Sequence, residues 1–113
     1  MKINEFLNGH IGVRIHGEME HRAFRKILKA FKAEYIAPLN KGYSYLKEML
    51  EKYNSRYPQT FLEPLCYTYQ PWKGICIEWE HEVEKQVEDD WYDEIVDFGV
   101  IKQECKEIIE GLK

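Results

Sequence analysis

One segment, residues 18–33, constrains the fold more than any other part of the sequence. Its apolar residues recur at the i, i+3, i+4, i+7 spacing, which places them on one face of an α-helix. These residues are Phe24, Ile27, Leu28 and Phe31. The opposite face carries the cations Arg22, Arg25, Lys26, Lys29 and Lys32. The segment is therefore predicted to be a surface helix whose apolar face must pack against another layer of structure.

The segment before this helix, residues 10–16, has the two-residue period of a strand. Ile11, Val13 and Ile15 fall on one face of such a strand, and Gly12 falls on the other. The predicted strand is therefore half-buried, with its apolar face toward the core.

Two later runs, residues 65–70 and 75–80, predict a β-hairpin. Both are rich in aromatic and β-branched residues, and they flank the turn at 71–74. The alternation in the second run puts Trp79 on the apolar face, so we expect it in the core. Trp72 lies in the turn and is expected to be exposed.

The remaining segments complete a small mixed pattern. The sequence predicts a helical turn over 3–7, a turn at 37–42, a helix over 43–54, an extended connection over 58–64, an edge strand over 94–98 and a helix over 101–112. The acidic stretch 82–90 fits either a helical turn or a loop. We therefore predict a single α+β domain over 1–113, with a three- or four-stranded, mostly antiparallel sheet packed against two or three helices.

Composition narrows the class of protein. The hydrophobic fraction of 44% supports a folded core. No apolar run approaches a membrane span, and residues 1–10 lack the pattern of an export signal, so no membrane association is expected. Cys66, Cys76 and Cys105 fit neither a disulfide framework nor a metal motif, which predicts reduced thiols and a cytoplasmic protein.

The charge is polarised along the chain. Residues 1–56 have a balance of +5, whereas residues 57–113 have a balance of −9, and the net charge is −4. Residues 78–94 alone hold nine carboxylates against one cation, Lys85. Such blocks affect the choice of partner more than they affect the fold.

Motifs that carry chemistry are absent from the sequence. It contains no nucleophile elbow and no glycine-rich phosphate loop. His16 and His21 flank the predicted strand-to-helix corner, but their spacing matches no metal-ligand signature, so structural roles are favoured. His81 lies beside carboxylates and is expected at the surface. We therefore predict a protein that is not an enzyme and has no catalytic residues, metal or cofactor.

The acidic segment is interleaved with large aromatic residues, and this mixture favours a protein interface. Aromatic side chains supply affinity, while negative charge steers the chain to a basic partner. The predicted partner-binding residues are Trp72, Glu78, Glu80, Glu82, Glu84, Glu88, Asp89, Asp90 and Trp91. Direct nucleic-acid binding through the basic helix is not expected, because the whole chain is acidic with a pI near 5.6.

Three alternatives stay open. The chain could instead be a small-ligand binding protein or enzyme, in which Tyr67, Tyr69, Trp72 and His16 line a pocket for a nucleotide or another ring-bearing metabolite and Arg14 pairs a phosphate. An immunity protein for a basic nuclease toxin would use the same acidic surface. The basic helix of one copy could also meet the acidic segment of another in a homodimer, or the two could pair inside one chain.

The order of segments resembles that of small proteins from phages and prophages. The resemblance rests on INEFLNG, HIGVRIH, GEMEHRAFRKILKAF, CYTYQPWKGICIEWE and DEIVDFGVI, taken in this order. It covers most of the chain as a pattern and carries over no functional residue. Members of that group with assigned roles include anti-CRISPR and other anti-defence inhibitors. The resemblance implies an inhibitor that binds a host defence protein. Where that protein is a nucleic-acid-binding effector, the inhibitor's carboxylates would mimic phosphates.

Overall fold

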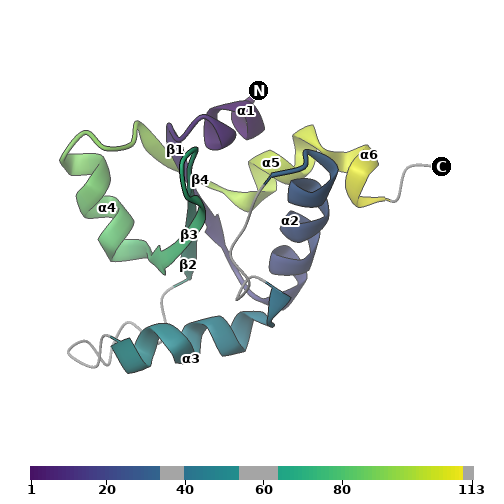
Figure 1. Cartoon of the computed structure of the whole chain (residues 1–113). Helices are drawn as coiled ribbons and strands as arrows, with labels where there is room; N and C mark the ends of the chain where they lie inside the picture. Colours follow the sequence, from purple (N-terminus) through teal and green to yellow (C-terminus); the bar gives the residue numbers. More distant parts are fainter. Residues whose placement is uncertain (34–39, 54–63, 111–113) are drawn as a thin grey trace.

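The computed structural model describes residues 1–33, 40–53 and 64–110, and these residues form an α+β fold (Figure 1). The strands are β1 (Ile11–Ile15), β2 (Leu65–Gln70), β3 (Gly74–Trp79) and β4 (Glu94–Asp97). The helices are α1 (Lys2–Leu7), α2 (Glu18–Ala30), α3 (Tyr43–Tyr53), α4 (Glu80–Glu88), α5 (Phe98–Glu104) and α6 (Lys106–Ile109). The predicted α+β class is confirmed.

The four strands form one sheet in the order β3-β2-β1-β4. The pairs β3–β2 and β2–β1 are antiparallel, as predicted, whereas β4 lies parallel to β1 at the edge. Val13 pairs with Tyr67, which pairs with Ile77, so these side chains share one face. The adjacent row is Arg14, Cys66 and Glu78, which lies on the other face.

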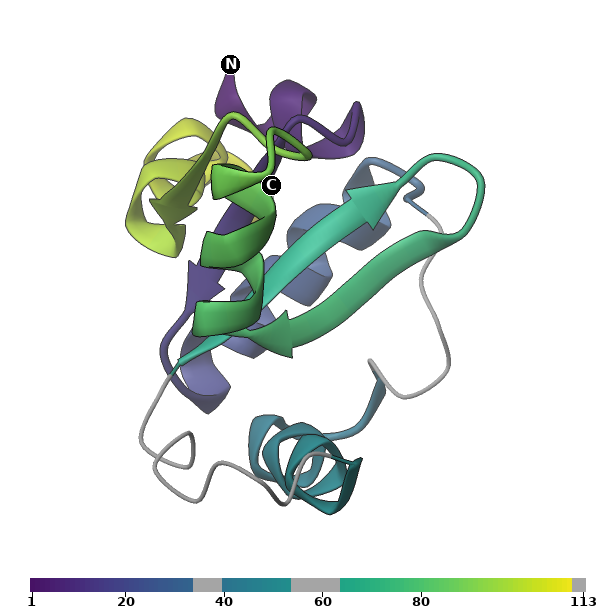
Figure 2. The ribbon, with the colours of Figure 1, turned by 90° about the vertical axis from the view of Figure 1, so that its left-hand side faces the viewer.

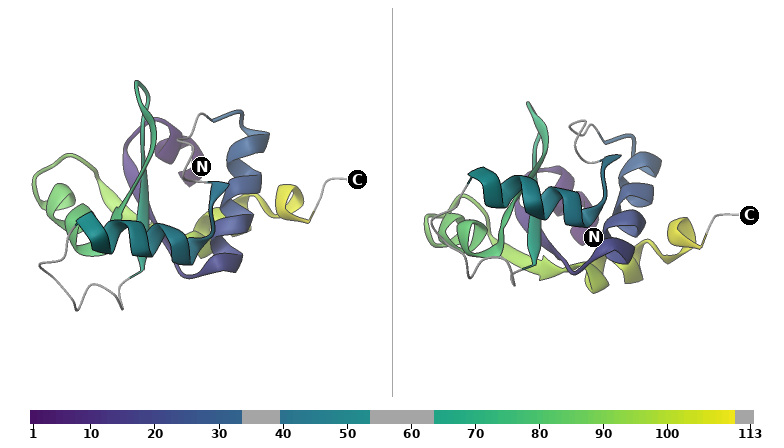
Figure 3. Two further views of the ribbon diagram at one scale, coloured as in Figure 1. Left: turned by 60° about the horizontal axis from the view of Figure 1, so that its bottom comes forward. Right: turned by 90° about the horizontal axis from the view of Figure 1, so that it is seen from below.

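Helices cover both faces of this sheet. The main core contains residues of α1, α2, α3 and α5 packed on the face that includes Val13 and Tyr67. A smaller cluster, built on Cys66, Val83 and Tyr92, lies on the other face under α4. Figure 2 shows α4 in front of the sheet and α2 behind it, and Figure 3 shows the same separation from below.

The close packing of α4 depends on Gly12 in β1. A Cβ atom at Gly12 would lie 3.1 Å from Cys66 Sγ and 3.1 Å from Val83 Cγ1, so a side chain would collide with the helix and its neighbouring strand. Strand β1 is thus covered on both faces, and the prediction of a half-buried strand is wrong on this point.

Several predicted boundaries need correction. The ambiguous acidic stretch is helix α4, which begins at Glu80 and so shortens the predicted strand 75–80. Helix α2 ends at Ala30 rather than at residue 33. The single helix predicted over 101–112 is two helices that meet at Cys105, whose φ and ψ of −112° and 28° leave the helical region. The predicted turn at 37–39, the connection through 58–63 and residue 112 lie outside the described residues.

No helix in the described residues is both long and apolar enough to cross a lipid bilayer.

Candidate functional site

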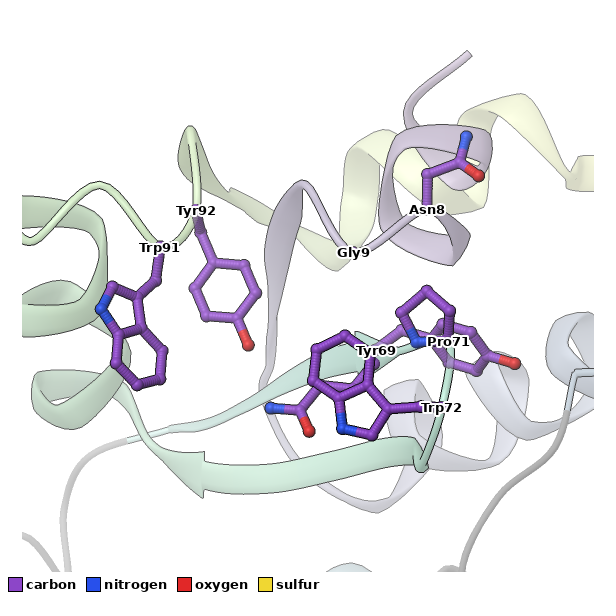
Figure 4. Close-up of a pocket in the computed structure, with 8 residues that line it drawn as sticks. Asn8, Gly9, Tyr69, Pro71, Trp72, Trp91 and Tyr92 are labelled. Carbon is purple, nitrogen blue, oxygen red and sulfur yellow. The ribbon is translucent and has the colours of Figure 1, made fainter.

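Two tryptophans from distant parts of the chain are exposed beside the same hollow (Figure 4). Trp72, in the β2–β3 turn, has 83% of its surface exposed, and Trp91, between α4 and β4, has 66% exposed. The hollow has a volume of about 280 Å³. Its lining residues are Asn8, Gly9, Tyr69, Gln70, Pro71, Trp72, Trp91 and Tyr92. We call this the aromatic hollow.

The end of α4 fixes the position of Trp91. Asp90 adopts a left-handed conformation, with φ of 63°, and its amide donates to the Val87 carbonyl at 3.1 Å. The Trp91 amide then donates to the Gln86 carbonyl at 2.8 Å. This pair of hydrogen bonds is a Schellman motif, which ends the helix and reverses the chain. Trp91 therefore leaves α4 in a defined direction although its side chain is exposed.

The turn between α1 and β1 forms a second wall of the aromatic hollow. Gly9 has a φ of 79°, and a Cβ atom there would lie 3.0 Å from the Tyr69 carbonyl oxygen and 3.4 Å from Pro71 Cδ. The hairpin therefore approaches the Gly9 backbone so closely that a side chain there would crowd the Tyr69 carbonyl, in addition to the strain of the positive φ. The predicted helical turn over 3–7 is confirmed, because α1 spans Lys2–Leu7 and ends just before Asn8 and Gly9.

Contacts with distant segments hold this turn in place. The Glu104 carboxylate of α5 accepts hydrogen bonds from the first amides of α1, at 2.8 Å from Lys2 and 3.0 Å from Ile3. On the other side, the Asp93 amide donates to the His10 carbonyl at 2.7 Å. The backbone hydrogen bond between Asp93 and His10 therefore joins the segment that carries Trp91 to the turn that contains Gly9.

The structure divides the predicted carboxylates into two groups. The exposed group is Glu84, Glu88, Asp89 and Asp90. Within the described residues, none of these four forms an ion pair. Three of them, Glu88 to Asp90, directly precede Trp91 in the sequence, and Trp91 lines the aromatic hollow.

The other predicted carboxylates are partly buried and have partners. Glu80 forms an ion pair with Arg14, whose Nη1 also lies 2.8 Å from Asp97 Oδ1. Burial lowers the pKa of Arg14, but hydrogen bonds to Asp97 and Glu80 outweigh that effect and raise it overall. A guanidinium held by two carboxylates ties α4 and β4 to β1.

Glu78 in β3 and Glu82 in α4 lie near enough to each other that, besides burial, the charge of Glu82 helps to raise the pKa of Glu78. Burial raises the pKa of Glu78, although a hydrogen bond with Gln86 acts in the opposite direction. Glu82 Oε1 lies 3.1 Å from Nε2 of His81, which is only partly exposed. These two carboxylates contribute less to the open acidic surface than the exposed group does.

The histidines at the strand-to-helix corner do not meet. His21 is fully buried, with Nδ1 at 2.7 Å from the Tyr67 hydroxyl and Nε2 at 2.8 Å from the Lys41 carbonyl. Because a carbonyl only accepts, Nε2 is the donor and Nδ1 accepts from Tyr67. His16 is exposed beside Glu20. In the part of the chain that the structure describes, no group of three potential ligands could hold a metal ion.

The structure does not assemble the small-ligand pocket considered from the sequence. Tyr67 is fully buried in the core, and burial raises the pKa of its hydroxyl. Arg14 lies on the opposite face of the sheet and is already paired. Of the residues considered, only Tyr69 and Trp72 line the aromatic hollow.

The basic helix and the acidic segment lie on opposite sides of the sheet. Helix α2 contacts α3, α5 and α6, whereas α4 contacts β2, β3 and β4 (Figure 1). Among the described residues, no ion pair joins a cation of α2 to a carboxylate of α4, and Arg22 of α2 instead pairs with Glu18 of the same helix. A second hollow, of about 550 Å³, lies between α2 and α5 with Arg22, Lys26 and Lys102 in its lining.

The sequence singled out Trp72 and Trp91 as candidate partner-binding residues but gave no sign that they line one hollow. Its other aromatic residues, Tyr69 and Tyr92, carry no signal that separates them from core residues, and Tyr92 is in fact 7% exposed. No family model, curated protein or solved structure matches this chain. The argument for function therefore depends on the site itself.

Proposed function

We propose that this chain is a non-enzymatic binding protein that docks on a basic surface of another protein through the aromatic hollow and the exposed carboxylates beside it. The observation that carries the proposal is the convergence of Trp72 and Trp91 on one hollow. Exposed apolar side chains that gather at one place mark interaction sites, and tryptophan is enriched at the centres of protein interfaces.

The exposed carboxylates indicate the charge of the partner. Glu84, Glu88, Asp89 and Asp90 lie on α4 and its end, and no described cation neutralises them by an ion pair. Such a surface accelerates encounter with a basic patch and opposes an acidic one. It also disfavours a nucleotide in the aromatic hollow, because the phosphates would meet like charge.

Within this class, we propose an inhibitor of a nucleic-acid-binding defence protein, encoded by a phage or mobile element and acting in the cytoplasm of the host cell. The segment order resembles that of small phage and prophage proteins, some of which are anti-defence inhibitors, and this supports the proposal. The exposed carboxylates could occupy positions that phosphates take on such a target. An immunity protein for a basic nuclease toxin would use the same surface, and the identity of the partner separates the two.

The experiment is affinity capture from the lysate of the native host, with quantified binding of the captured protein. Two baits carry the same charge change: Glu88→Lys with Asp89→Lys beside the hollow, and Glu48→Lys with Glu107→Lys at exposed positions on α3 and α6. The proposal predicts a stoichiometric basic partner whose association rate falls about tenfold or more for the first bait at low salt and is nearly unchanged for the second. Equal binding by both baits would show that the acidic surface is not used.

A further inference from the structure

The aromatic hollow has the composition of a site for an organic cation. Figure 4 shows Trp91 and Tyr92 hanging from one segment, opposite Trp72 and Pro71 of the hairpin turn. The faces of aromatic rings carry partial negative charge and attract cations that lie over them. A volume of about 280 Å³ suits one long side chain rather than a larger metabolite.

The charge around the hollow selects for the same ligand. Residues 88–93 hold four carboxylates and no lysine or arginine, and all four are exposed. Across the hollow, residues 69–73 contribute one cation, Lys73, beside Trp72. The hollow therefore combines aromatic faces with an excess of negative charge on the segment that carries Trp91 and Tyr92.

We propose that the aromatic hollow binds the guanidinium group of an arginine side chain presented by the basic partner. This inference rests on the proposed function, and it names the chemical group that the surface recognises. The guanidinium lies against the indoles of Trp72 and Trp91, and its edge donates hydrogen bonds toward the carboxylates that precede Trp91.

Arginine fits these features better than the alternative side chains. Its guanidinium is planar and weakly hydrated, so it stacks on aromatic rings at a small cost of desolvation, and its fork of N–H groups matches a carboxylate. A lysine ammonium is compact and strongly hydrated, so it gains less from the rings. An apolar side chain would leave the carboxylates unused, and an acidic one would be repelled by them.

The test measures the binding of short capped peptides to the whole chain by calorimetry at low salt. The probes share one glycine–serine framework and carry either arginines, lysines or citrullines at the same positions. Citrulline has the shape of arginine without its charge. Three variants of the chain are compared: Trp72→Ala, Trp91→Ala, and Tyr45→Ala as the control, since Tyr45 is 50% exposed on α3 and lies outside the hollow.

The inference predicts the order arginine, then lysine, then citrulline, with roughly tenfold or more between the first and the last. Each tryptophan substitution should weaken the arginine peptide by about 3- to 30-fold, while Tyr45→Ala leaves its affinity unchanged. Melting temperatures near that of the wild type will verify that the variants are folded.

Two results would overturn the inference. In the first, the arginine and lysine peptides bind equally and lose affinity only with Glu88→Lys and Asp89→Lys, so the acidic surface is used but the hollow does not select arginine. In the second, no peptide binds. Failure of the proposed function is distinct from both, because it appears as retention of the captured partner by the charge-reversed bait.

Discussion

Substitution of Gly12 by alanine tests whether α4 packs on the sheet as the structure shows. Gly12 is buried in β1, and a Cβ atom there would lie 3.1 Å from Cys66 Sγ, 3.1 Å from Val83 Cγ1 and 3.5 Å from Thr68 Cγ2. Carbon atoms pack best at about 3.5–4.0 Å, so the first two contacts are short by roughly 0.4–0.9 Å. The Cys66 and Val83 side chains must therefore shift by a few tenths of an ångström to admit the methyl group.

Two opposing contributions determine whether Gly12→Ala raises or lowers the free energy of unfolding. Overpacking a buried site costs about 1–3 kcal/mol. Replacing glycine by alanine elsewhere in regular structure gains about 0.5–1 kcal/mol by restricting the unfolded chain. The net expectation for Gly12→Ala is a loss of about 0–2.5 kcal/mol, which corresponds to a fall of roughly 0–10 °C in Tm for a chain of this size.

Urea and thermal unfolding followed by circular dichroism measure this change, and Gly99→Ala is the matched control. Gly99 is exposed in α5, and a Cβ atom there would meet nothing within 4 Å, so this substitution should stabilise the protein. In a Val83→Ala background, the cost of Gly12→Ala should shrink because one of the two short contacts is gone. If Gly12→Ala is as stabilising as Gly99→Ala, α4 does not lie against β1 and this reasoning fails.

Three further substitutions probe the remaining structure. Gly9→Ala should lower the free energy of unfolding by about 1–3 kcal/mol, measured in urea, because it combines a φ of 79° with a contact of 3.0 Å to the Tyr69 carbonyl; an unchanged midpoint would contradict the close approach. Asp90→Gly should raise Tm, with a gain of about 0.5–1 kcal/mol, since glycine suits the left-handed φ of 63°; a loss would mean that the Asp90 side chain stabilises the turn. Burial raises the pKa of Glu78 above its usual value of 4.5, so the stability of the wild type falls as the pH rises from 4.5 through the pKa in the folded state. Glu78→Gln cannot ionise at this position and should therefore be more stable than the wild type at neutral pH. The unfolding curves of the two proteins should converge below pH 4.5.

The spacing of apolar residues correctly predicted helices with a continuous apolar stripe and strands in which apolar and polar residues alternate strictly. Phe24, Ile27 and Leu28 are fully buried, as their spacing in α2 requires. Alternation placed Trp79 in the core, where its side chain is 2% exposed, and the turn chemistry placed Trp72 outside. These features depend only on neighbours in sequence, so local rules are sufficient for them.

Features that depend on contacts between distant segments could not be predicted in this way. Helix α4 buries only Val83 completely, too little apolar periodicity to separate a helix from a loop. The parallel pairing of β4 with β1 joins Ile11 to Glu94, and no local signal encodes that register. The pairing of Glu80 with Arg14 likewise follows from the tertiary fold. The number of carboxylates in 78–94 therefore overstates the unpaired negative charge at the surface.

The aromatic hollow shows the same limit at the functional site. It forms where Gly9, the hairpin turn and Trp91 meet, and these lie in three separate parts of the chain. The exposure of Trp72 was predictable from its turn, whereas the proximity of Trp91 required the sheet order and the position of α4.

The most direct test of the docking surface uses the three tryptophans of the chain as reporters. Nitrogen-15 NMR would follow their indole N–H signals, assigned with Trp→Phe variants, during titration with the partner recovered by the wild-type bait. Trp72 and Trp91 should shift on binding, while Trp79, which lies in the main core with its side chain 2% exposed, should not. Formation of the complex with the Trp72 and Trp91 signals unmoved would contradict the account.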